Sequence, residues 1–413
     1  MSGLAQANAL HIPFADGVFQ MVCTSPPYWG LRDYGTGAWV DGDSACDHKA
    51  PPTGGPNPVR YTPGGSDMFR TANDKSYRDA CGKCGAVRVD SQLGLEPVPD
   101  CQGWATGQPC GECYICHMVQ VYREVRRVLR DDGVCFVNLG DSYASSVNGT
   151  SAAQTKANGN DDRTFRDKPF STVGHGLKPK DMCGIPWRVA LALQADGWWL
   201  RSDIIWSKSN PMPESVTDRP TKSHEYVFLL AKSARYFWDA EAVKEPTIWA
   251  NDPRAGNGRH TYDGKRDGTD GQGQEAFVSI DPSGRNLRTV WSIPTQPYSG
   301  AHYATFPEAL VERCVLAGSK PGSRVFDPFC GSGTTIQVAR RLGRQGYGLD
   351  LSRVYLEENA LPRALGKNTA AALATLPLFG GTEQADEPPK QDQLGKRTYT
   401  GFNARWKEQE SRP

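Results

Sequence analysis

The sequence contains no long hydrophobic run and no marked excess of charge of either sign. No segment approaches the ~18 consecutive apolar residues of a membrane-spanning helix, and no apolar segment near Met1 resembles a secretory signal peptide. We therefore expect a cytoplasmic protein with no membrane partner. The formal net charge is only +1 at pH 7, so any contact with nucleic acid must come from a local basic patch.

Two further absences narrow the class of protein. No internal repeat at a solenoid period is visible, and the glycine-rich loop lacks the Gly-Lys-Ser/Thr ending that grips nucleotide phosphates, which argues against ATP hydrolysis. The 413 residues can bury a full α/β core and still carry inserted modules. The chain has 12 cysteines, and in a large cytoplasmic protein these favour metal binding or chemistry over disulfide bonds.

Apolar runs with strand character alternate with helical patterns over most of the chain. We predict strands in the segment that begins at Ala7 and at residues 18–23, 134–142, 203–206, 224–233, 323–326 and 346–352, with a turn at 131–133. Helices are predicted at residues 118–130, 185–200, 306–318, 335–343 and 355–365. This alternation predicts an α/β fold with a doubly wound, mostly parallel sheet.

Shifts in composition divide the chain into a main domain, two notable insertions and a tail. Residues 1–365 carry the periodic segments, whereas residues 41–117 are loop-rich and hold most of the close cysteine pairs. Residues 241–290 are rich in glycine and mixed in charge, without core periodicity. The polar, proline-bearing segment 366–413 is expected to be a flexible tail.

A Ser-Pro-Pro-Tyr corner ends the predicted strand at residues 18–23. Pro26 and Pro27 fix the backbone and remove donors, so the carbonyls of Ser25 and Pro26 can point into a cleft as rigid acceptors. Tyr28 offers a flat apolar face. The corner is suited to hold a planar base through its exocyclic amino group while the base stacks on Tyr28. A structural turn with a packed tyrosine is the plainer alternative.

A glycine-rich loop, DPFCGSGTT at Asp327–Thr335, follows the predicted strand at residues 323–326. Gly331 and Gly333 stand before a helix, where the backbone must approach a ligand closely. A second strand ends in Asp350, at the offset of about 20 residues that suits a pair of ribose hydroxyls. A mere tight turn is the alternative, and the two acidic residues flanking the loop argue against it.

The cysteines outside the predicted core form two sets with metal-ligand spacing. The first set is C-x-H followed by C-x2-C, and the second is C-x8-C followed by C-x2-C-x2-C. The candidate ligands are Cys46, His48, Cys81 and Cys84 in the first set and Cys101, Cys110, Cys113 and Cys116 in the second. We expect one or two structural Zn²⁺ ions that order the insertion. Reduced cysteines in an unstructured insertion, ligation that interleaves the sets, and His117 as a substitute ligand are the alternatives.

The corner and the loop together resemble the S-adenosylmethionine-dependent DNA methyltransferases that modify amino groups. Their catalytic motif, (D/N/S)PP(Y/F), matches Ser25–Tyr28, and their cofactor motif, DPFxGSGTT, matches Asp327–Thr335 with Cys330 at the variable position. A helix that begins FPEAL, here Phe306–Leu310, normally precedes the cofactor motif. The catalytic motif comes first, which is the circularly permuted order of the beta class. NLGDSY, DIIWSKSNPMPES and HEYVFLLAKS also look familial, so that the resemblance spans residues 7–365.

The resemblance implies a Rossmann-like methyltransferase sheet and a direct methyl transfer. The amino nitrogen of a flipped base attacks the sulfonium methyl, while Ser25, Pro26, Pro27 and Tyr28 form the catalytic corner; no covalent enzyme intermediate is needed. The resemblance also implies that Asp350 binds the ribose of the cofactor. The other cofactor-binding residues that it implies are Phe306, Pro307, Asp327, Phe329, Gly331, Ser332, Gly333, Thr334 and Thr335.

The target base is favoured as cytosine, modified at N4, because a serine at the first motif position is commoner in those enzymes. Adenine N6 is the alternative. A cytosine-C5 enzyme would need a Pro-Cys nucleophile; Pro109-Cys110 stands among three other cysteines, so we interpret Cys110 as a metal ligand. The rival functions are an RNA or protein-glutamine methyltransferase, disfavoured by the long inserts and the motif order, and a non-enzymatic zinc DNA-binding protein, disfavoured by the intact motifs.

Double-stranded DNA is the expected partner, with a cognate restriction endonuclease as a second candidate; the oligomeric state stays open. Residues 241–290 occupy the place where the family carries its target-recognition region. Basic side chains there suit phosphates or guanine edges, although a solvated loop is the alternative. The candidates are Arg254, Arg259, His260, Lys265, Arg266, Arg285 and Arg288.

Overall fold

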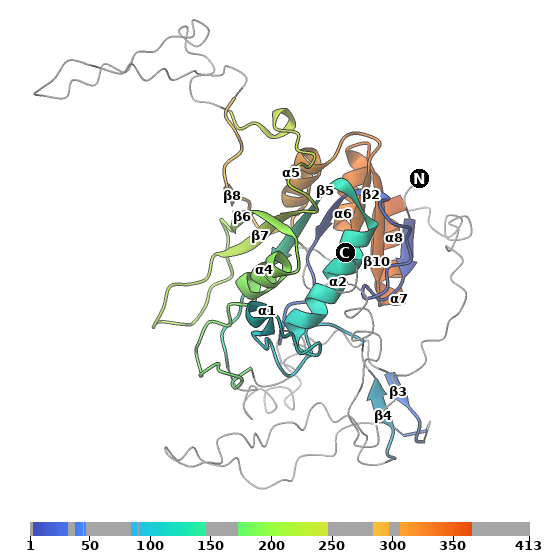
Figure 1. The fold of residues 1–413 in the computed structure, drawn as a ribbon, viewed down its shortest axis with the longest axis vertical. Coiled ribbons are helices and arrows are strands. Elements are labelled where there is room, and N and C mark those ends of the chain that lie inside the picture. The colour runs from blue at the N-terminus through green and yellow to red at the C-terminus, as the bar shows by residue number, and fades with distance from the viewer. Residues whose placement is uncertain are drawn as a thin grey trace, which may run out of the picture.

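The computed structural model describes residues 3–31, 38–43, 45–46, 84–89, 91–145, 172–246, 284–296 and 306–365. An eight-stranded sheet lies at its centre, with helices on both faces (Figure 1). A separate two-stranded antiparallel ribbon joins β3 (Ala38–Val40) to β4 (Val87–Val89). Within the described residues, no helix is long and apolar enough to cross a membrane.

The order of the central sheet is β1-β10-β9-β2-β5-β7-β6-β8. Its strands are β1 (Gly3–Gln6), β2 (Phe19–Thr24), β5 (Leu129–Leu139), β6 (Trp199–Ser207), β7 (His224–Ala231), β8 (Val290–Ser292), β9 (Arg324–Asp327) and β10 (Gln345–Asp350). All neighbours are parallel except at β7, which runs antiparallel to both β5 and β6. The predicted α/β fold with a mostly parallel sheet is therefore confirmed.

Both faces of the sheet are covered, which explains why its strands read as continuous apolar runs. Val22 of β2 belongs to the core cluster beneath α2 (Tyr114–Val128) and α4 (Ile185–Ala195). Met21 and Cys23 point to the opposite cluster beneath α5 (Glu308–Gly318) and α6 (Thr334–Arg341). The remaining helical elements are α1 (Gly103–Thr106), η2 (Glu241–Val243), α7 (Arg353–Tyr355), η3 (Leu356–Ala360) and α8 (Leu361–Leu365).

The centre of the sheet is the pair β2 and β9, which are neighbours although they lie far apart in the sequence. Phe19 of β2 stacks on Phe326 of β9, with ring centroids 4.6 Å apart and an interplanar angle of 13°. Loss of one such buried ring typically costs about 3–5 kcal/mol. After β2 the chain next enters the central sheet at β5, on one side of the pair, and after β9 it next enters the sheet at β10, on the other side. The loops after β2 and β9 therefore diverge and leave a crevice between them, the usual ligand site in such sheets.

Several element boundaries differ from the prediction. The first strand lies before Ala7, at Gly3–Gln6, and β5 begins at Leu129, where we expected a helix end and a turn. The helix predicted over 185–200 ends at Ala195, because Gly197 adopts a left-handed φ of 98° and its N–H donates to the Gln194 carbonyl. The strand β6 then begins at Trp199.

The cysteine-rich insertion is only partly peripheral. Its last residues form the first turn of α2, which begins at Tyr114, and Cys113, Tyr114 and Cys116 are at most 1% exposed. The predicted boundary at residue 117 therefore falls inside a core helix. The predicted tail 366–413 and residues 247–283 of the predicted target-recognition region lie outside the described residues.

Candidate active site at the carboxyl edge of the sheet

A cavity of about 850 Å³ opens at the carboxyl edge of the parallel strands. Its wall combines the segments that follow β1, β2, β6, β8, β9 and β10 with the start of β7. Both sequence motifs reach it: Ser25–Tyr28 from β2, and Phe329–Ser332 from β9. The crevice between β2 and β9 thus brings together two loops that are distant in sequence.

The glycine loop and Asp350 form one side of this cavity. The Gly331 N–H donates to Asp350 Oδ2 at 3.0 Å, and the Ser352 N–H donates to Oδ1 at 2.8 Å. Burial raises the pKa of Asp350 above its usual range. Gly333 has a φ of 78°, and a Cβ there would lie 2.9 Å from Ala360 Cα. A larger residue at this position therefore meets backbone strain and a clash with η3.

Asp327 lies behind the wall, 1% exposed, and joins the two motifs. Its Oδ1 accepts hydrogen bonds from Thr24 Oγ1 at 2.7 Å and from the Phe329 N–H at 3.1 Å. Burial raises the pKa of Asp327 to about 6, and these two hydrogen bonds oppose the rise. Thr335 Oγ1 also donates to the Cys23 carbonyl at 3.0 Å. The ends of β2 and β9 are thus fixed to one another directly before Ser25.

Tyr28 connects the Ser-Pro-Pro-Tyr corner to a polar network on the other side of the cavity. Its hydroxyl donates to Glu225 Oε2 at 2.8 Å and receives a hydrogen bond from Ser25 Oγ at 3.3 Å. Asn138 Nδ2 donates to the same Glu225 oxygen at 3.0 Å. A Cβ on Gly140 would lie 2.7 Å from Tyr28 Cε2, so this glycine makes room for the ring.

Glu225, Lys208 and Asn138 line the cavity but were not predicted as site residues. Lys208 Nζ donates to Glu225 Oε1 at 2.5 Å and lies 4.8 Å from the centroid of the Trp206 ring. Asn138 and Lys208 could have been predicted from the sequence, because each is a polar residue near the carboxyl end of a predicted strand, the edge of such a sheet where ligands bind. Glu225 stands at the start of β7 and reaches this edge only because β7 is reversed, a direction that no local pattern reveals.

Some of the predicted cofactor-binding residues line the cavity, and the others lie behind the lining residues and hold them in place. Phe306, Phe329, Gly331, Ser332, Thr334 and Asp350 line the cavity. Pro307 caps α5, where its carbonyl accepts from the Leu310 N–H at 3.0 Å. Thr335 is fully buried against β2, and Gly333 packs on η3.

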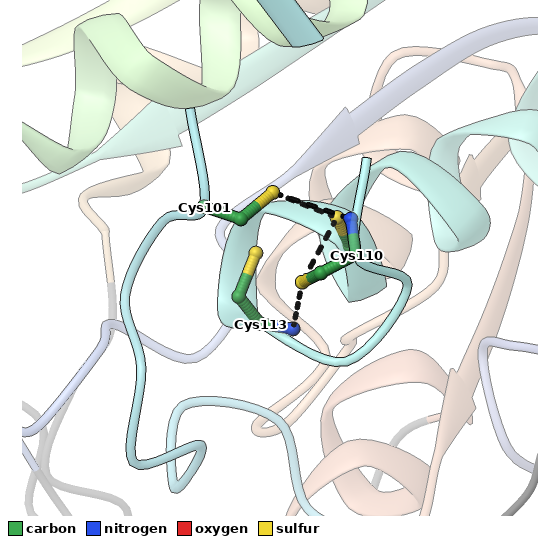
Figure 2. A group of neighbouring side chains, drawn as sticks. Cys101, Cys110 and Cys113 are labelled. Carbon is green, nitrogen blue, oxygen red and sulfur yellow. Dashed lines mark hydrogen bonds between the residues drawn. The ribbon is translucent and has the colours of Figure 1, made fainter. Parts of the chain in front are cut away.

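Four of the eight predicted metal ligands gather in one place. Cys101, Cys110, Cys113 and Cys116 have sulfur atoms that all lie within 4.8 Å of one another. Figure 2 shows three of these side chains turned toward a common centre beside the start of α2. From the other set, Cys46 follows β3 in the sequence and Cys84 precedes β4, while His48 and Cys81 fall outside the described residues. His117 Nδ1 lies 2.8 Å from Glu96 Oε1.

Two of the seven predicted DNA-contacting basic residues lie in the described part of the chain. Arg285 and Arg288 are exposed, and both form ion pairs with Glu245 Oε2, at 3.1 and 2.8 Å. A β-bridge between Glu245 and Arg285 brings the two ends of the region together.

Comparison with known proteins identifies the family. The family model for DNA methylase, N6_N4_Mtase, matches residues 19–361. The chain is 38% identical to the Type II methyltransferase M.SmaI of Serratia marcescens, over 82% of each chain. It is 36% identical to M.Cfr9I of Citrobacter freundii, over 86% of this chain and 83% of the relative. A solved structure, PvuII DNA methyltransferase (cytosine-N4-specific), matches with a TM-score of 0.47 and 15% identity over 91% of this chain and 90% of that one.

The chain therefore belongs to the N6/N4 DNA methylase family and is a DNA methyltransferase. The predicted family resemblance is confirmed.

Proposed function

We propose that this protein transfers a methyl group from S-adenosylmethionine to the exocyclic amino group of a base in double-stranded DNA, with cytosine N4 as the favoured position. The observation that carries the proposal is the single cavity into which the Ser25–Tyr28 corner and the glycine loop both open. A two-substrate transfer needs adjoining sites for donor and acceptor, and neighbouring strands β9 and β2 supply one motif each.

The cofactor fits the side beneath β9 and β10. Asp350 is the ribose ligand in this proposal, since its carboxylate is fixed by two backbone N–H groups at the rim of the cavity. Phe306, Phe329 and the cavity-lining residues of the glycine loop surround the remainder of the cofactor. Asp327 supports this side from behind by holding Phe329 and Thr24.

The flipped base fits the side beneath β2 and β5. The carbonyls of Ser25 and Pro26 accept from its amino group, and Tyr28 provides the stacking face. S-adenosylmethionine supplies an electrophilic methyl: the new N–C bond forms as the S–C bond breaks, and one amino proton leaves to solvent. Glu225 Oε2 and Asn138 Oδ1 lie 2.8 and 3.4 Å from the Tyr28 hydroxyl and thereby orient the ring.

Cytosine is favoured over adenine because Ser25 occupies the first position of the catalytic motif; adenine N6 is the alternative. The relatives are named Type II methyltransferases, which favours a cognate restriction endonuclease as a functional partner. Residues 241–290 are proposed to read the target sequence, with the ends of the region tied together at Glu245.

Two substitutions with opposite readouts test the site assignment. Tyr28→Ala should abolish most methyl transfer to DNA while the cofactor dissociation constant stays the same. Gly331→Val should abolish cofactor binding, because the φ of 46° at residue 331 strains a β-branched side chain. The strain falls on the backbone N–H of residue 331 that donates to Asp350, the proposed ribose ligand. Tyr28→Phe keeps the ring and removes the hydroxyl, so it distinguishes the contribution of stacking from that of the hydroxyl. Radiolabelled methyl transfer and calorimetry measure the two properties; unchanged turnover in both main variants would refute the assignment.

We also propose that Cys101, Cys110, Cys113 and Cys116 bind a structural Zn²⁺ ion. The sulfurs of Cys101 and Cys116 are 3.7 Å apart, and those of Cys110 and Cys116 are 3.9 Å apart. A tetrahedron with Zn–S bonds of about 2.3 Å has edges of about 3.8 Å. Backbone N–H groups of Gly103 and Cys110 donate to Cys101 Sγ at 3.4 Å, which suits a thiolate ligand.

A further inference from the structure

We infer that the four-cysteine metal site is a clamp that positions the catalytic corner, acting through two hydrogen-bonded arms that begin beside metal ligands. This inference rests on the proposed function, since it assigns the corner Ser25–Tyr28 a catalytic role. The metal would join Cys101, at the end of the loop 91–101, to three cysteines around the start of α2. Both of these segments contact the corner.

The first arm runs through Tyr114, which follows Cys113 in the sequence. Its hydroxyl donates to the Pro27 carbonyl at 2.8 Å, and its side chain is fully buried. The Tyr114 N–H also donates to the Val98 carbonyl at 3.1 Å. This residue therefore binds the corner at one end and the loop 91–101 at the other.

The second arm runs through His117, which follows Cys116. His117 Nδ1 lies 2.8 Å from Glu96 Oε1, while Glu96 Oε2 accepts from the Gly94 N–H at 2.8 Å. The Gly94 carbonyl accepts from the Gly30 N–H at 2.9 Å, and the Glu96 carbonyl accepts from Trp29 Nε1 at 2.8 Å. The loop thus grips the chain directly after Tyr28.

The two arms meet the corner on either side of Tyr28, and neither includes the strands β9 and β10 that carry the cofactor residues. A metal ion that fixes the loop 91–101 against α2 therefore fixes the corner from two directions. Loss of the metal frees Cys101 from α2 and weakens both arms together. Turnover should fall, whereas cofactor binding, which depends on the other side of the cavity, should persist.

The hydroxyl of Tyr114 gives a test that leaves the metal ligands intact. Tyr114→Phe removes the hydrogen bond to Pro27, and we expect kcat to fall about tenfold with cofactor affinity and zinc content unchanged. Tyr122→Phe is the matched control: Tyr122 lies on the same helix, is fully buried, and its hydroxyl has no hydrogen-bond partner among the described residues. It should retain wild-type kcat.

Metal analysis tests the clamp itself. Cys110 is the exposed member of the four, so Cys110→Ser disturbs packing least. We expect the wild-type protein to contain zinc by elemental mass spectrometry, and Cys110→Ser to lose one equivalent together with most of its kcat. Wild-type protein without zinc, or an unchanged zinc content in Cys110→Ser, would overturn the metal site.

Equal kcat in Tyr114→Phe and Tyr122→Phe would overturn the coupling to the corner. Absence of DNA methylation by the zinc-loaded wild-type protein would refute the proposed function instead, because the zinc content is measured independently of activity.

Discussion

Substitution of Gly94 by alanine should reduce methyl transfer far more than it reduces stability. Gly94 has a φ of 91°, and a Cβ there would lie 2.9 Å from the Tyr28 carbonyl oxygen and 3.6 Å from Pro27 Cβ. A left-handed conformation costs a non-glycine residue about 1–2 kcal/mol. The contact with Tyr28 is with backbone, so rotation of a side chain cannot relieve it, and the corner itself must move.

Gly322→Ala is the control, because Gly322 has a φ of 81° but nothing within 4 Å of the added Cβ. Gly322→Ala should lose about 1–2 kcal/mol of unfolding free energy in urea titrations, and Gly94→Ala at least as much, because it adds the contact with the Tyr28 carbonyl to the backbone strain. Only Gly94→Ala should lose turnover, by about 100-fold if the corner shifts by about 1 Å. Similar turnover in the two variants would show that the loop 91–101 does not position the corner.

Three further predictions concern the cavity. Gly140→Ala places a Cβ 2.7 Å from Tyr28 Cε2, so kcat should fall while calorimetry finds unchanged cofactor affinity; a weakened cofactor site would contradict this division of the cavity. Burial raises the pKa of Asp327 from 3.8 to about 6, so between these pH values the folded protein binds a proton that the unfolded chain does not, and the unfolding free energy should fall as the pH rises from about 4 to 6. Asp327→Asn should remove this pH dependence in urea titrations, and an equal pH dependence in the variant would argue against the raised pKa. Glu225→Gln weakens the acceptor shared by Tyr28, Asn138 and Lys208, so kcat should fall about tenfold or more. In the double variant with Lys208→Met, the loss of activation free energy should be smaller than the sum of the two single losses, and a full sum would show that Glu225 and Lys208 act separately.

The sequence predicted the features that depend on local patterning. Apolar runs buried on both faces marked β2, β7, β9 and β10 within one or two residues, and a turn signal followed each motif strand. The adjacency of β2 and β9 was harder to predict, because strands far apart in the sequence pair through long-range packing such as the Phe19–Phe326 stack. The family motifs supplied that link.

The parts of the site that were missed depend on tertiary geometry. Glu225 reaches the cavity because β7 is reversed, and Tyr114 reaches Pro27 because the cysteine-rich segment enters the core at α2. The spacing of the cysteines indicated metal ligands, but it could not show that the residues next to them contact the corner. Helix ends were misplaced where a glycine such as Gly197 terminates the helix early.

Mass spectrometry of nucleosides from the DNA of a methylation-free host that expresses this chain tests the proposed DNA methylation most directly. We predict N4-methylcytosine at a defined sequence, lost when Tyr28 is replaced by alanine. N6-methyladenine would keep the site and overturn the base. Absence of both products, from soluble protein that binds S-adenosylmethionine, would contradict the central claim that the corner and the glycine loop together methylate an amino group of DNA.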